Sequence, residues 1–73
     1  MSVSKKIKAL LQMRDKKQLD LAACFGMTKQ TMSNKMARES WSAADLIKTA
    51  DFLECRVAFI LPDGQHIYLD NNE

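Results

Sequence analysis

Histidine and cysteine are scarce in this 73-residue chain, and their scarcity excludes several kinds of site. One histidine and two cysteines supply neither the ligand set of a zinc site nor the framework of a disulfide-stabilised fold. We expect Cys24 and Cys55 to be small buried side chains in a reducing compartment, with a bridge between them as the lesser alternative. No nucleophile or acid is grouped with His66, so we expect no enzyme, no metal and no other cofactor.

Long apolar runs are also missing. No stretch approaches the ~20 apolar residues that a membrane-spanning helix needs, and the opening residues MSVSKKIKALL contain no signal-peptide core. We therefore expect a cytoplasmic protein without a membrane partner. The chain is short enough for one domain, residues 1–73, and its 47% hydrophobic and 27% charged residues suit a folded globule.

Acidic residues are rare in the first half of the sequence. Residues 1–38 hold nine Lys/Arg and two Asp, a net charge of +7. Residues 39–73 hold two Lys/Arg and seven Asp/Glu, a net charge of −5. This asymmetry favours a first half that faces a polyanion over the plainer interpretation, a solvated basic helix surface.

Apolar residues recur at helical spacing through four segments of the chain. The predicted helices span about residues 4–13, 18–25, 29–37 and 43–54. Thr28 and Ser42 precede the third and fourth, where a hydroxyl can accept a hydrogen bond from a free helix amide. The fourth helix is predicted to bury Ala43, Leu46, Ile47, Ala50 and Leu53.

Gly26, one of only two glycines, interrupts this helical pattern. Glycine fits the left-handed residue that commonly ends a helix, because it has no Cβ to clash. The second and third helices are therefore expected to be joined by about one tight turn. Such a pair is a helix-turn-helix, whose second helix enters the major groove of DNA.

The residues around this turn follow a known pattern. Gln18 opens the second helix, the small Ala22 follows four residues later, and Gly26 fills the turn. The pattern is completed by Leu21, Phe25, Met27, Thr28 and Met32. Over roughly residues 3–53 the sequence thus resembles the phage-repressor and Cro family of helix-turn-helix proteins. The resemblance implies a mostly α, four-helix, lambda-repressor-like DNA-binding domain that acts as a transcriptional regulator. It also implies that Gln18 reaches a phosphate or braces a base-contacting Gln.

Burial of Met32 and Met36 would turn a polar side of the third helix outward. The side chains predicted to read bases are Gln18, Lys29, Gln30, Ser33 and Asn34. Residues 28–38 contain no acid, although a merely soluble helix surface usually mixes acids with lysine. Lys35 departs from the family pattern, which has a large apolar residue there, and Met36 is expected to pack instead. Phosphate contacts are predicted for Lys16, Lys17, Thr28, Lys35 and Arg38, with Lys5 and Arg14 as further candidates.

After residue 54 the pattern changes to two short β-branched and aromatic runs separated by a Pro-Asp-Gly turn. It predicts a β-hairpin over about residues 56–69, followed by a frayed end at residues 71–73. A lone hairpin is marginal in water. It therefore either closes the core of its own chain or forms a homodimer through Val57, Phe59, Leu61, Ile67 and Leu69. The main functional prediction is a sequence-specific repressor of double-stranded DNA, and the alternative is a protein-interaction module, such as an antitoxin or adaptor, of the same fold.

Overall fold

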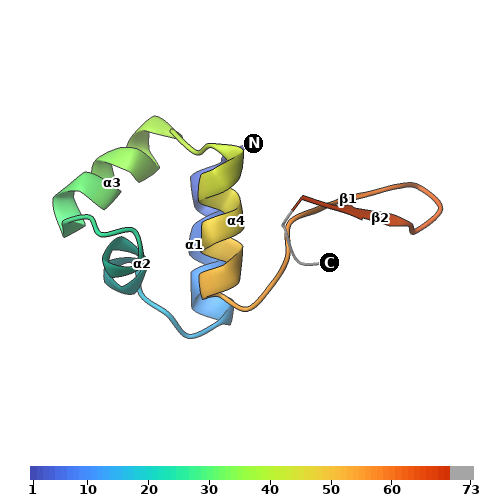
Figure 1. The fold of residues 1–73 in the computed structure, drawn as a ribbon. Helices are drawn as coiled ribbons and strands as arrows, with labels where there is room; N and C mark the ends of the chain where they lie inside the picture. Colours follow the sequence, from blue (N-terminus) through green and yellow to red (C-terminus); the bar gives the residue numbers. More distant parts are fainter. Residues whose placement is uncertain (70–73) are drawn as a thin grey trace. The chain divides into compact units, whose positions relative to one another are not determined.

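The computed structural model describes residues 1–69, which form four helices and one two-stranded sheet (Figure 1). The elements are α1 (Val3–Met13), α2 (Gln18–Cys24), α3 (Lys29–Arg38), α4 (Ala43–Phe52), β1 (Ala58–Ile60) and β2 (His66–Tyr68). Every helix begins and ends within two residues of its predicted bounds. The fraying expected at residues 71–73 lies outside the described residues.

The chain divides into two compact units, one spanning Met1–Ser42 and the other beginning at Ala43. The first unit contains α1, α2 and α3, and the second contains α4 and the hairpin. None of the helices in residues 1–69 is long and apolar enough to cross a membrane.

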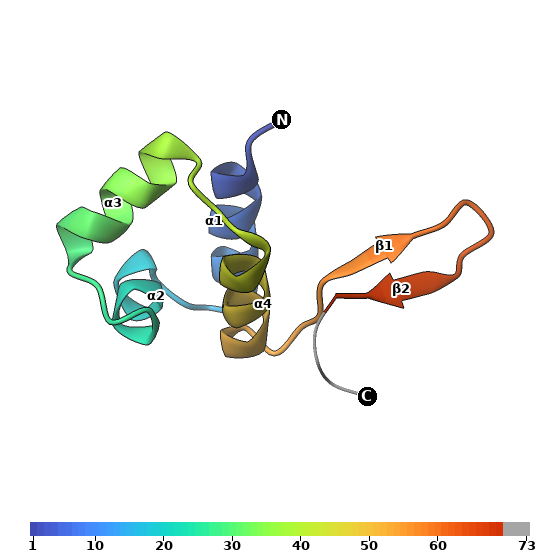
Figure 2. The same cartoon turned by 45° about the horizontal axis from the view of Figure 1, so that its top comes forward.

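The first unit packs an apolar stripe from each of its three helices. The buried apolar side chains of this unit are Ile7, Leu11, Leu21, Ala22, Met32 and Met36. Leu21, Ala22 and Met32 are completely inaccessible to solvent. Alanine at position 22 lets α2 and α3 approach closely, and both views of the fold show these helices side by side (Figures 1 and 2).

The turn between α2 and α3 has the predicted left-handed glycine. Gly26 has φ 66°, its N–H donates to the Ala23 carbonyl over 3.0 Å, and the Met27 N–H donates to the Ala22 carbonyl over 2.9 Å. These two bonds form a Schellman motif, which ends α2 abruptly. Thr28 then caps α3, because its Oγ1 accepts from the Thr31 N–H over 3.1 Å. The predicted reversal of the backbone is confirmed.

The other helix ends in the described chain also use a left-handed residue, but an acidic one. Asp15, Glu39 and Glu54 follow α1, α3 and α4 with φ between 55° and 58°. Amides just beyond each end donate back to the last turn, as Lys16 does to Leu11 over 2.8 Å. Of the four helix ends, the sequence predicted a left-handed residue only at Gly26, because an acidic residue at a helix end does not indicate a left-handed conformation.

In the second unit, α4 buries Thr49, Ala50 and Leu53. The prediction that Ala43 is buried is wrong: it is exposed, because it is the first residue of α4 and no preceding turn covers it. Leu46 and Ile47 are half-buried. Thr49 was not predicted to be buried, but its hydroxyl donates to the Asp45 carbonyl over 2.9 Å, which satisfies the polar group within the helix.

The hairpin of the second unit pairs β1 with β2 in antiparallel fashion, which confirms the predicted hairpin with its turn over residues 62–65. The opposing residues are Ala58 and Tyr68, Phe59 and Ile67, and Ile60 and His66. Leu61 N–H donates to the Gln65 carbonyl over 2.8 Å to close the loop.

Candidate nucleic-acid interface

Three of the side chains that the sequence assigned to base reading are exposed on α3, namely Lys29, Gln30 and Asn34. Met32 and Met36 of the same helix are buried. Arg38 extends the same surface at the end of the helix. With no acid between residues 28 and 38, this surface presents only cations, amides, hydroxyls and a small apolar side chain.

The amide side chains of Gln30 and Asn34, both predicted to contact bases, are joined by a hydrogen bond. Gln30 Nε2 donates to Asn34 Oδ1 over 3.2 Å, the spacing of one helical turn. Gln30 keeps a second N–H and its carbonyl oxygen, and Asn34 keeps its amino group and a second lone pair. Each amide therefore still offers both a donor and an acceptor to the edge of a base.

Gln18 and Ser33 meet across the helix pair. Both are half-buried, and Gln18 Nε2 donates to Ser33 Oγ over 3.3 Å. Gln18 therefore contacts Ser33 on α3, whereas Gln30 is hydrogen-bonded to Asn34. Because Ser33 immediately precedes Asn34 on α3, the hydrogen bond from Gln18 holds that part of α3 against α2.

The predicted phosphate contacts fall into two groups. Lys16, Lys17 and Arg38 are exposed, the first two in the connection between α1 and α2. Lys35 and Thr28 have partners within the chain. Lys35 Nζ donates to the Ser40 carbonyl over 2.7 Å and lies 5.1 Å from the Trp41 ring centre. The Thr28 hydroxyl donates to Thr31 Oγ1 over 2.9 Å while it caps α3.

The C-terminal end of α3 is held to the start of α1 by side chains that sequence reasoning did not assign to this role. Glu39 accepts hydrogen bonds from Ser2 Oγ and from the Ser4 N–H, the latter over 3.0 Å. The Ser2 hydroxyl, and next the Ser4 N–H, hold the pKa of Glu39 below its ordinary value, because both bonds stabilise the carboxylate. Buried Ser4 donates to the Met36 carbonyl over 2.6 Å. These partners are 32 to 37 residues apart, so no local pattern reveals them.

Trp41 completes this attachment. Its Nε1 donates to Ser4 Oγ over 3.0 Å, and its ring meets Phe25 edge-on with the ring centres 6.3 Å apart. Phe25 immediately precedes the Gly26 turn. The single tryptophan therefore contacts α1 and the end of α2, and it reports on the packing of the first unit.

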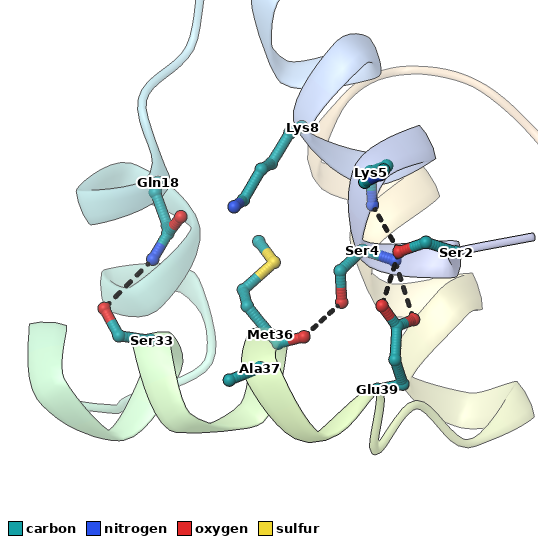
Figure 3. A pocket seen from close by; sticks show the side chains of 9 residues that line it. All are labelled: Ser2, Ser4, Lys5, Lys8, Gln18, Ser33, Met36, Ala37 and Glu39. Carbon is teal, nitrogen blue, oxygen red and sulfur yellow. Dashed lines mark hydrogen bonds between the residues drawn. The ribbon is translucent and has the colours of Figure 1, made fainter.

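A pocket of about 370 Å³ opens between α1, α2 and α3 (Figure 3). Its lining residues are Ser2, Ser4, Lys5, Lys8, Gln18, Ser33, Met36, Ala37 and Glu39. Sequence reasoning gave Lys8 no role, whereas Lys5 was a further candidate for a phosphate contact. Their spacing of three residues puts both on one face of the helix, which is the signal that could have paired them.

The hairpin residues predicted to form a dimer surface are exposed apart from Val57, which is half-buried. Phe59 is 61% exposed, Ile67 55%, Leu69 38% and Leu61 37%. Ile60, which was not among the predicted dimer residues, is also exposed, at 69%.

The described residues hold no group of three or more side chains suited to a metal ion. Cys24 and Cys55 are not joined by a disulfide, and both are half-buried, somewhat less covered than predicted. Comparison with protein-family models, curated proteins and solved structures finds no match to this chain.

Proposed function

We propose that this chain is a sequence-specific regulator of double-stranded DNA, with a lambda-repressor-like fold, that acts by occupying an operator. One observation carries the proposal: α3 follows a tight left-handed turn and exposes Lys29, Gln30 and Asn34 on an acid-free surface. The ten residues of α3 form a rod about 15 Å long, which suits a major groove about 12 Å wide.

The exposed side chains fit distinct roles at such a groove. Gln30 and Asn34 pair with the N6 and N7 edge of adenine, and Lys29 donates to the O6 and N7 acceptors of guanine. Lys17 and Arg38 lie where cations contact the phosphates on either side of the reading helix, which orients the protein without selecting sequence. The mechanism is steric and electrostatic, with no reaction performed by the chain.

Selection of bound duplexes from a random pool tests these roles. Each bidentate contact discriminates by about 1–3 kcal/mol, so Gln30→Ala or Asn34→Ala should relax the preference at one position about 5- to 150-fold. Lys17→Ala should weaken all duplexes alike and lower the salt slope by about 1. If Asn34→Ala and Lys17→Ala had the same effect on every duplex, the assigned roles would be wrong.

We further propose that operator binding uses a homodimer joined through the hairpin. A single α3 reads few base pairs, and two copies reach half-sites one helical turn, about 34 Å, apart. Phe59 and Ile67 oppose each other in the hairpin, and their exposed apolar side chains supply the surface that a second copy would cover.

Sedimentation at micromolar concentration tests the dimer. We expect a species of twice 8.3 kDa, reduced to 8.3 kDa by Phe59→Arg with the Trp41 fluorescence of the first unit unchanged. A single 8.3 kDa species for the unaltered chain would remove the dimer. Such a monomer that also fails to shift any duplex at low salt would favour the alternative, an adaptor or antitoxin whose hairpin binds another protein.

A further inference from the structure

We propose that the pocket between α1, α2 and α3 binds one phosphate of the DNA backbone, with Lys8 as its cation. The inference rests on the proposed DNA-binding function and adds a cation from α1 to the contacts that α3 makes. The pocket is formed by residues 2–39 of the first unit alone.

The end of the pocket near Gln18 is rich in hydrogen-bond donors. Figure 3 shows Lys8 extending from α1 toward Gln18 and Met36. Ser33 Oγ accepts from Gln18 Nε2, so the Ser33 O–H and the second Gln18 N–H remain as donors. The Lys8 ammonium, the Gln18 amide and the Ser33 hydroxyl thus line one open pocket, with Lys8 on the Oε1 side of Gln18 and Ser33 on its Nε2 side (Figure 3). An ammonium with such donors in the same pocket suits the oxygens of a phosphate.

The one acid of the pocket lies at its other end. Glu39 stands with Ser2 and Ser4, away from Gln18 and Ser33, in the same view (Figure 3). Its carboxylate already accepts from Ser2 Oγ and the Ser4 N–H. Lys5 and Lys8 line the same pocket, so its lining carries two cations and one carboxylate. Lys8 is the cation at the end away from Glu39 (Figure 3).

The position of Ser33 connects the pocket to base reading. Ser33 lines the pocket while Asn34, the next residue of α3, is exposed on the reading surface. A phosphate held at Ser33 and Lys8 therefore belongs to the strand that borders the bases read by Asn34. For this reason we assign the pocket to a backbone phosphate and not to a small free anion.

Salt-dependent binding to the selected duplex tests the contact, with Lys6→Ala as the matched control. Lys6 is exposed on the same helix but does not line this pocket. Loss of one phosphate contact lowers the salt slope by about 0.9. For Lys8→Ala, the loss of affinity between 50 and 200 mM salt should therefore be about 3.5-fold smaller than for the unaltered chain. Lys6→Ala should change this salt-dependent loss of affinity by less than half as much. Lys8→Arg should leave the loss as it is in the unaltered chain.

Neutral methylphosphonate groups, placed singly along the duplex, locate the contact. At one position the modification should lower the affinity of the unaltered chain for the duplex. The same modification should not lower the affinity of Lys8→Ala any further. If Lys8→Ala and Lys6→Ala have the same salt dependence and no modified position distinguishes Lys8→Ala from the unaltered chain, the pocket proposal is overturned. The DNA-reading proposal would still stand if Asn34→Ala altered the selected sequence. Saturable binding of inorganic phosphate without such a position would also overturn the pocket proposal, in favour of a small-anion site. Failure of the unaltered chain to bind any duplex would overturn both proposals.

Discussion

Substitution of Gly26 by alanine tests the turn that projects α3. Gly26 has φ 66°, and a Cβ built there meets no atom within 4 Å, so the cost is one of backbone conformation and not of steric overlap. A left-handed alanine costs about 1–2 kcal/mol, and the reduced entropy of the unfolded chain offsets about 0.4–1 kcal/mol of it. We expect Gly26→Ala to lower the free energy of unfolding by about 1 kcal/mol, or Tm by about 4–8 °C.

Urea unfolding followed by the fluorescence of Trp41 measures this change, because Trp41 is the only tryptophan and contacts Phe25 beside the turn. Gly26→Asn serves as the matched control, since asparagine enters the left-handed region more readily than alanine. It should lose less than half as much stability. A midpoint for Gly26→Ala equal to or above that of the unaltered chain, at the same slope, would contradict a left-handed residue at this position.

Three further substitutions probe the rest of the first unit by the same assay. Met32→Ala should cost about 2–5 kcal/mol, because the side chain is fully buried, and a loss below 1 kcal/mol would mean that α3 is not packed as described. Glu39→Gln should remove a contribution to stability that is present above the ordinary pKa of 4.5 and is lost as the pH falls below it, since the folded pKa is lowered. Identical acid unfolding curves for Glu39→Gln and the unaltered chain would refute the tie to α1. Asp15→Gly should raise stability by up to about 1 kcal/mol by relieving a left-handed acid, and a loss of stability would count against that geometry.

The elements that the sequence predicted well are those set by neighbouring residues. The Gly26 turn, the Thr28 cap and the hairpin around Gly64 each depend on a few adjacent side chains with strong conformational preferences. The burial of Met32 and Met36 followed from helical period alone, and it fixed which side of α3 faces outward.

The features that the sequence did not predict depend on residues far apart in the chain. Glu39 looked like one more surface acid, yet it reaches Ser2 and Ser4, and the burial of Ser4 follows from that contact and from Trp41. Lys8 gains its interest only from the pocket that folding forms beside it. Local patterns carry no information about such pairs. The exposed polar side of α3 was therefore predictable, whereas the contacts that hold α3 to α1 were not.

Titration of the isotope-labelled chain with its selected duplex, followed by NMR, tests the central claim most directly. The account predicts that the largest shifts fall on the amides of residues 28–38, with smaller ones at Lys8, Lys16 and Lys17. Shifts confined to the hairpin, with residues 28–38 unchanged, would contradict it.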